Sequence, residues 1–286
     1  MAFTYGQVVS SGKATVYINN KPKTEIKQIK HPTTEKENNQ EQPSETNELQ
    51  IGYGKYYALI IGISNYDDPL IAQLFRPVKD AEIFYNMLTT RYTFEKENVT
   101  LLRNATIAEI INALDYFATL ITPVDNFLIF YAGHGMWEKD AEIGYWLPSD
   151  AARNSKLAWF RNSTLRDYLR AIKSKHTLLI SDACFAGSIF KSRSAFTDAT
   201  LAINKLYELP SRKAMTSGTF TEVPDQSVFL KYLIDRLQNN LEKYLTSEQL
   251  FSRFRMAVIN NSSVLPQYGV IQDVGDEGGD FIFILK

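Results

Sequence analysis

Two residues whose side chains could do chemistry together each follow a separate apolar run. Cys184, the only cysteine among 286 residues, comes shortly after the run at 177–180. His134 follows the run at 126–131 and has a glycine on each side. A thiol and an imidazole form a nucleophile and base when they lie within hydrogen-bond reach. The sequence therefore predicts a catalytic thiol–imidazole pair, provided that the two runs are neighbouring strands.

The composition of both runs is typical of buried parallel strands. In open α/β sheets, reactive groups lie beyond the carboxyl ends of the strands, which is where Cys184 and His134 would fall. The glycines beside His134 allow the backbone to come close to a ligand. Two other interpretations remain open, because a lone buried cysteine can be an inert small hydrophobe and a histidine after a strand can be a turn residue.

Strands and amphipathic helices alternate along most of the chain. We expect strands at 56–63, 99–102, 126–131 and 177–180, separated by helices at 78–90, 107–120 and 163–172. This order predicts a parallel sheet with right-handed crossovers. Further on, we expect a strand at 214–216, helices at 227–239 and from Thr246 or Ser247 to 258, and a last core strand at 281–285.

The segment 187–212 shows weak periodicity and scattered basic residues, and we interpret it as a mobile connection or cleavable linker. Its basic residues are Lys191, Arg193, Lys205 and Arg212. Residues 1–31 are weakly structured, with a possible hairpin, and 32–54 form a polar linker that buries too little to order itself. We therefore expect a single catalytic domain at 55–286, with residues 1–50 as the candidate region for a regulatory contact.

The overall composition is that of a globular protein, with 44% hydrophobic and 22% charged residues. The formal net charge of −1 argues against a general attraction to nucleic acid or anionic membranes. No apolar run approaches the roughly 20 residues of a membrane span, and the N-terminus lacks the layout of a secretion signal. One cysteine cannot form an internal disulfide. We expect a cytoplasmic protein that binds neither nucleic acid nor membrane.

Nine short stretches, in a fixed order, connect this chain to a known family. They are Y-Y-A-L-I-I-G-I, K-D-A, F-Y-A-G-H-G, Y-W-L-P-S-D-A, S-D-A-C-F-A-G, M-T-S-G, S-V-F, L-F-S-R-F-R and G-G-D-F-I-F. His134 and Cys184 are 50 positions apart, which is the caspase spacing. With these stretches and this spacing, the sequence from Lys55 to Lys286 resembles caspase-fold cysteine peptidases, most closely the prokaryotic metacaspase-like branch. The resemblance implies an α/β three-layer sandwich with a mostly parallel six-stranded central sheet and helices on both faces.

The resemblance also implies a cysteine endopeptidase that uses His134 and Cys184. The backbone N–H groups of Gly135 and Cys184 are candidates for stabilising the oxyanion, and the family orients its histidine with a backbone carbonyl. In metacaspase-like enzymes an aspartate two residues before the cysteine, here Asp182, selects Arg or Lys in the substrate. A carboxylate can bind a guanidinium bidentately; alternatively, Asp182 only hydrogen-bonds neighbouring loop amides. Glu222 and Asp225 are further candidates for the pocket wall.

No cofactor is expected from this sequence. There is no dense acidic cluster resembling the calcium-binding loop of metacaspases, so calcium activation lacks support. Three dispersed histidines and one cysteine do not make a zinc site, and the glycines around His134 lack the third glycine of a dinucleotide fingerprint. We expect His176 to hydrogen-bond at a strand edge. The aromatic residues at 137–159 could line a groove, although packing is the simpler interpretation.

The expected partners are protein or peptide substrates with basic residues, and the chain itself could be cleaved within 187–212. Two other function classes remain open. One is a catalytically silent caspase-fold scaffold that binds partners through residues 1–50. The other is a flavodoxin-like ligand-binding domain, which would share the sheet but leave the His and Cys pairing unexplained.

Overall fold

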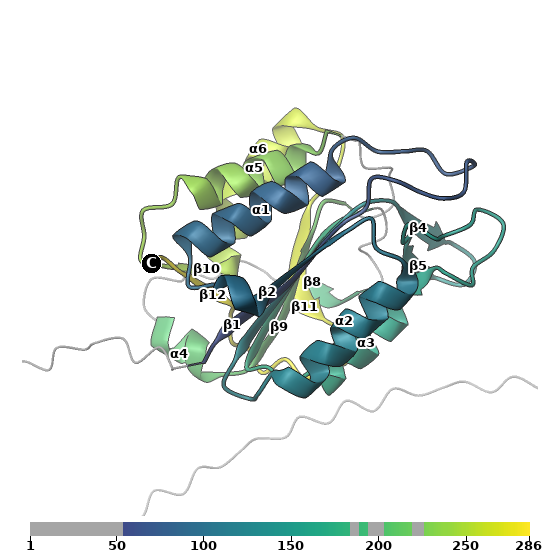
Figure 1. Ribbon diagram of the computed structural model, residues 1–286. Coiled ribbons are helices and arrows are strands. Elements are labelled where there is room, and N and C mark those ends of the chain that lie inside the picture. The colour runs from purple at the N-terminus through teal and green to yellow at the C-terminus, as the bar shows by residue number, and fades with distance from the viewer. Residues whose placement is uncertain (1–53, 184–188, 194–202, 219–225) are drawn as a thin grey trace, which may run out of the picture. The chain divides into compact units, whose positions relative to one another are not determined.

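The described part of the chain, in a computed structural model, comprises residues 54–183, 189–193, 203–218 and 226–286 (Figure 1). All of these residues belong to one compact unit. The possible N-terminal hairpin and nearly all of the expected linker lie outside the described residues. The division into 1–31, 32–54 and 55–286 therefore stays a prediction.

The central sheet has mostly parallel strands. Its order in space is β2 (Val99–Arg103), β1 (Tyr56–Gly62), β3 (Asn126–Ala132), β7 (His176–Asp182), β9 (Ser211–Thr216), β11 (Gln267–Ile271) and β8 (Phe190–Arg193). The first five strands are mutually parallel, and β11 runs antiparallel to both β9 and β8. The predicted fold class is confirmed, and the short β8 adds a seventh strand at the edge.

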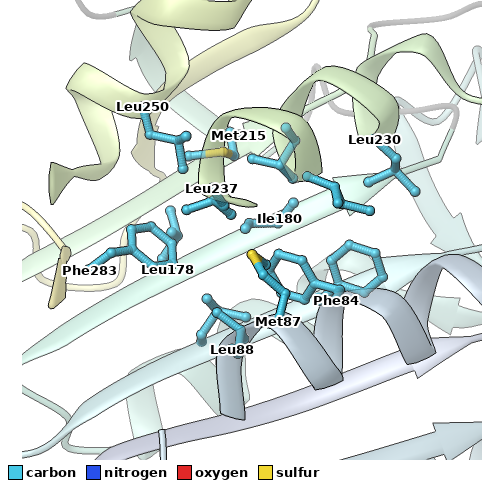
Figure 2. Close-up of a cluster of buried hydrophobic side chains, with 14 of the residues drawn as sticks. Phe84, Met87, Leu88, Leu178, Ile180, Met215, Leu230, Leu237, Leu250 and Phe283 are labelled. Carbon is cyan, nitrogen blue, oxygen red and sulfur yellow. The ribbon is translucent and has the colours of Figure 1, made fainter. Parts of the chain in front are cut away.

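Helices cover both faces of this sheet (Figure 1). One face carries α1 (Pro77–Arg91), α5 (Val228–Gln238) and α6 (Ser247–Asn261), and the other carries α2 (Ile107–Leu120) and α3 (Asn162–Ala171). Successive strand residues point to opposite faces, so Ala58 and Ile60 pack in the first layer while Leu59 and Ile61 pack in the second. Figure 2 shows the first layer, in which side chains of α1, α5 and α6 meet those of the strands.

Smaller elements surround this sandwich. They are η1 (Lys96–Asn98), α4 (Ile203–Glu208), a three-stranded sheet of β4 (Gly135–Glu138), β5 (Ile143–Trp146) and β6 (Phe160–Arg161), and a two-stranded sheet of β10 (Tyr244–Thr246) and β12 (Ile282–Ile284). The last predicted strand, at 281–285, corresponds to β12. It is buried, as expected, but it pairs with β10 and does not join the central sheet. Strand β11 was not predicted.

Local sequence signals explain where the main helices begin. Thr106 caps α2 in a reciprocal capping box with Glu109, and Thr246 caps α6 in the same way with Gln249. Proline at the first position starts α1. Just before this cap, the Asn104 side chain accepts hydrogen bonds from the backbone N–H groups of residues 64 and 65, which holds the loop after β1 in place.

The described part of 187–212 contains β8, α4 and the start of β9, so it has more regular structure than its weak periodicity indicated, while cleavage within this segment stays a prediction. Arg212 is buried, and its guanidinium donates to the backbone oxygens of residues 174, 175 and 211. Tyr207 of α4 is also buried, and its hydroxyl accepts from Asn126. These elements depend on contacts distant in sequence, so local periodicity could not reveal them.

The described helices include none that is both long and apolar enough to cross a membrane.

Candidate active site

The two strands that lead to the predicted dyad are neighbours in the sheet. β3 and β7 are parallel and are paired with a constant offset of 50 positions, from Asn126 beside His176 to Ala132 beside Asp182. His134 and Cys184 are also 50 residues apart, so each follows its strand by two residues. Cys184 itself lies outside the described residues, which stop at 183 on this side. The adjacency of strands that the dyad requires is present.

The imidazole of His134 is partly exposed and meets a backbone carbonyl. Its Nε2 lies 2.9 Å from the oxygen of Ala72. A carbonyl oxygen can only accept a hydrogen bond, so in the neutral imidazole Nε2 carries the proton and Nδ1 keeps the lone pair. Nδ1 is therefore the ring nitrogen that can accept a proton. The Ala72 carbonyl contacts the imidazole as an orienting carbonyl of the kind that the family resemblance implied would do, and the sequence could not identify it because every residue type has a carbonyl.

The backbone of His134 is held from both sides. Its N–H donates to the hydroxyl of Tyr66 at 2.8 Å, and its carbonyl accepts from the hydroxyl of Tyr131 at 2.7 Å and from the N–H of Leu147 at 3.0 Å. A Cβ added to Gly133 would lie only 2.9 Å from the Tyr131 hydroxyl. The glycine before the histidine thus leaves room for this tyrosine contact.

The N–H of Gly135 points away from its partner strand. Residues in an antiparallel pair alternate between hydrogen-bonded and non-hydrogen-bonded positions. The bond from Leu147 to His134 marks that pair as hydrogen-bonded. Gly135, which lies opposite Trp146, is then at a non-hydrogen-bonded position on the edge strand β4. Its N–H is therefore directed away from β5.

Asp182 ends β7 with a buried carboxyl group. Its side chain lies on the same face of the sheet as those of Leu178 and Ile180, which pack beneath α1 and α5. Only 6% of the residue is exposed. Within the described part of the chain its Oδ1 has no hydrogen-bond partner. Burial raises the pKa of Asp182 to about 7, although the hydroxyls of Ser217 and Ser227 oppose this rise. The carboxyl group therefore titrates near neutral pH.

A second carboxylate lies close by, and sequence reasoning missed it as a site residue. Asp80, in the first turn of α1, is 5% exposed, and its negative charge contributes to the raised pKa of Asp182. Its Oδ1 accepts from Nη2 of Arg76 at 2.8 Å. The sequence signal was an aspartate on the buried face of an amphipathic helix, where a charged residue is rare.

Two hydroxyl groups at the tips of β7 and β9, those of Ser181 and Thr216, are also buried without partners among the described residues, and they lie opposite each other in the sheet. Successive strand residues point to opposite faces, so these two hydroxyls lie on the other face of the sheet from the Asp182 carboxyl group. The hydroxyl that accompanies Asp182 on its own face is that of Ser217. The other two predicted pocket residues, Glu222 and Asp225, lie outside the described residues.

Other candidate residues have structural roles. Trp146 stacks on Tyr131 with 4.3 Å between ring centroids and is buried, so it packs rather than lines a groove. His176 is fully buried, its Nε2 donating to the carbonyl of Tyr207 and its Nδ1 accepting from Ser211. Burial lowers its pKa to about 3, so it stays neutral. In the part of the chain that the structure describes, no three His, Cys, Asp or Glu side chains gather as a metal site would require.

Comparison with known proteins decides the family. A sequence model of the caspase domain of peptidase family C14 matches residues 55–273. The chain belongs to the caspase family. No curated protein matches it. Among solved structures, the caspase domain is similar to caspase-1 from Spodoptera frugiperda, with a TM-score of 0.55 and 16% identity over 80% of this chain and 95% of that one.

The protein GSU0716 from Geobacter sulfurreducens is also similar, with a TM-score of 0.50 and 18% identity over 80% of this chain and 93% of that one. At these identities the two structures support the caspase fold alone. The family as a whole is one of cysteine peptidases, so the match to the caspase domain favours that class over a flavodoxin-like ligand-binding domain.

Proposed function

We propose that this protein is a cysteine endopeptidase in which His134 and Cys184 hydrolyse peptide bonds after Arg or Lys, as metacaspase-like enzymes do. The observation that carries the proposal is the pairing of β3 with β7, whose offset of 50 equals the separation of the two residues. A nucleophile and a base that follow adjacent parallel strands by the same number of residues start from the same edge of the sheet.

In the proposed reaction, Nδ1 of His134 takes the proton from the Cys184 thiol, and the thiolate attacks the scissile carbonyl carbon. The tetrahedral oxyanion is stabilised by the backbone N–H groups of Gly135 and Cys184. The outward direction of the Gly135 N–H supports its part in this role. Protonated His134 then gives its proton to the leaving amine, and water hydrolyses the thioester to release the acid and restore the thiol.

Selection of a basic side chain rests on Asp182. The carboxylate of Asp80 already has the guanidinium of Arg76, whereas Oδ1 of Asp182 has no partner among the described residues. A substrate guanidinium or ammonium group would give Oδ1 of Asp182 a partner by donating a charge-assisted hydrogen bond to it. The alternative, in which Asp182 only hydrogen-bonds neighbouring loop amides, predicts instead that Asp182→Asn loses activity equally toward basic and neutral peptides. Glu222 and Asp225 stay predictions for another wall of this pocket.

A covalent peptide probe tests the proposal directly. We expect a peptidyl acyloxymethyl ketone ending in Arg to add to the protein once, because the chain has a single cysteine, and peptide mapping should find the label on Cys184. The same probe ending in Asp should react far more slowly, since it would bring a second negative charge next to Asp182. The assay should be run with and without calcium, because calcium dependence and the predicted absence of any cofactor are untested.

The Cys184→Ala variant is the control, and it should take up no label. Equal labelling by the Arg and Asp probes would contradict basic selectivity. No labelling by either probe, under reducing conditions such as those of the cytoplasm in which we predict the protein works, would contradict the peptidase and favour the silent scaffold that binds partners through residues 1–50.

We further propose that the protein can process itself after Arg193. Of the basic residues in 187–212, Arg212 is buried within β9 and Lys205 lies in the helix α4. Lys191 and Arg193 both lie in the extended strand β8. We choose Arg193 because it is the last residue of that strand, at the start of the following connection. We expect cleavage to give fragments 1–193 and 194–286 on a denaturing gel.

These fragments should elute together in gel filtration, because β7 pairs with β9 and β8 pairs with β11 across the break. Arg193→Gln should prevent the cleavage, whereas the matched Lys205→Gln should leave it unchanged. Fragments that separate without denaturant, or cleavage that persists in Arg193→Gln, would contradict this assignment.

A further inference from the structure

One loop holds His134 at two points. The loop at residues 64–74 follows β1, and its Tyr66 hydroxyl accepts the backbone N–H of His134 at 2.8 Å. The carbonyl of Ala72 in the same loop meets Nε2 of His134 at 2.9 Å. The rings of Tyr66 and His134 also lie 5.0 Å apart at an interplanar angle of 42°. The main chain and the imidazole of the histidine therefore depend on one loop conformation.

The side chain of Gln73 holds this loop in shape. Its Oε1 accepts the backbone N–H of Tyr66 at 2.9 Å, and its Nε2 donates to the backbone carbonyl of Tyr66 at 2.8 Å. One amide thus satisfies both polar groups of one residue, as a neighbouring strand would. At the base of the loop, the N–H of Leu74 donates to the carbonyl of Ser64 at 2.8 Å. Gln73 follows Ala72 directly, so it links the two parts of the loop that contact His134.

We propose that Tyr66 and Gln73 are positioning residues that fix the location and tautomer of the catalytic base His134; this rests on the proposed function in assigning His134 as that base. The Tyr66 hydroxyl fixes the main chain of His134, and Gln73 keeps the Ala72 carbonyl where it selects the Nε2–H form. We call the hydrogen bonds that Tyr66 and Gln73 make in this loop the brace. Without the brace, the imidazole could rotate or carry its proton on Nδ1. A proton on Nδ1 would remove the lone pair that must accept the thiol proton.

Kinetic measurements on two variants test the brace. Tyr66→Phe removes only the hydroxyl, and Gln73→Met removes both amide bonds while keeping a similar side-chain length. For each we expect kcat to fall by about 10- to 100-fold, the size of effect that a misplaced catalytic group produces. The KM for an Arg-ending peptide should stay within about twofold, because neither residue is part of the proposed pocket. Rates should be divided by the fraction of protein that the Arg-ending probe labels, so that unfolded protein does not count.

A third variant distinguishes the two amide bonds. Gln73→Glu keeps an oxygen that can accept from the N–H of Tyr66, but it has no N–H to donate to the Tyr66 carbonyl. We therefore expect a loss of kcat smaller than that of Gln73→Met. Gln238→Met on α5 and Tyr116→Phe on α2 are matched controls at exposed positions, and both should behave as the unmodified protein.

The deciding measurement is the tautomer of His134, which can be observed without measuring peptidase activity. Nitrogen-15 NMR distinguishes protonated from unprotonated ring nitrogens, and the signals of His134 can be assigned by their loss in His134→Asn. The unmodified protein should show protonated Nε2 and unprotonated Nδ1 in neutral His134, whereas Gln73→Met should show a mixture of both tautomers. An unchanged tautomer together with an unchanged kcat in Gln73→Met would overturn the proposal. A protein without peptidase activity whose tautomer still shifts would contradict the proposed function but retain the brace.

Discussion

Cys184→Ala is expected to lower kcat/KM for an Arg-ending fluorogenic peptide by about 10³-fold or more. Alanine has no atom that can form the acyl-enzyme, so only residual catalysis by the oxyanion donors would remain. His134→Gln should cause a loss of similar size, because glutamine cannot take up the thiol proton. His134→Gln should unfold at a temperature close to that of the unmodified protein, since His134 belongs to neither of the buried core clusters.

The double variant gives the sharper test of this pair. Residues that act as one catalytic unit lose activity together, so removing the second should cost little once the first has gone. We therefore expect Cys184→Ala with His134→Gln to be no slower than the worse single variant. Losses that multiply would show that the two residues act independently, which would contradict the shared mechanism.

Asp182→Asn is expected to lower kcat/KM for Arg-ending and Lys-ending peptides by about 10²- to 10³-fold, as loss of one partner of a buried charge pair does. Peptides with a neutral residue at the cleavage site should be much less affected, because they do not use the carboxylate. Asp167→Asn, whose side chain is 70% exposed, removes the same charge from the surface and should leave both rates unchanged. An equal loss for basic and neutral peptides would argue against the pocket role.

The same substitution should change the pH dependence. In the free enzyme, burial holds the pKa of Asp182 at about 7, so the unmodified protein should lose activity toward basic peptides as the carboxylate is protonated below that pH. In Asp182→Asn this part of the pH profile should be missing.

Asp182→Asn should also stabilise the folded protein at pH 8. Because its pKa is raised from 3.8 to about 7 by folding, the folded state binds the proton more tightly, and the free energy of unfolding decreases as pH rises between these values. The full pKa difference corresponds to a ceiling of about 4 kcal/mol. A neutral amide avoids this cost, so the melting temperature should rise at pH 8 and change little at pH 4.

The dyad strands were predictable because each is a continuous apolar run, which is the pattern of a strand buried on both faces. The alternating order of strands and helices then predicted a parallel sheet, and the family resemblance gave the six-stranded sandwich. Ala72 could not be predicted, since it acts through a carbonyl that no side chain marks. The proximity of Asp80 to Asp182 could not be predicted for another reason. The sequence pattern predicts an amphipathic helix around Asp80, and only the fold brings the first turn of that helix near the end of β7.

The strand and helix within 187–212 were also missed, for a physical reason. Strand β8 and helix α4 are short, and short elements carry too little periodicity to be recognised. They are held by partners remote in sequence, as Tyr207 is by Asn126 and His176. Arg212 looked like a candidate cleavage site because arginines are usually exposed, whereas here three backbone carbonyls bind its guanidinium.

The parallel ladder between β3 and β7 has a consequence for how the domain can be altered. The backbone hydrogen bonds between β3 and β7 align the carboxyl ends of the two strands. This alignment does not depend on the length of polypeptide that connects the strands. All four residues of the turn at 139–142, between β4 and β5, are exposed to solvent. A peptide tag inserted between Asp140 and Ala141 would lengthen the polypeptide between His134 and Cys184 without changing the pairing of β3 with β7. This turn is therefore a suitable site for an engineered insertion.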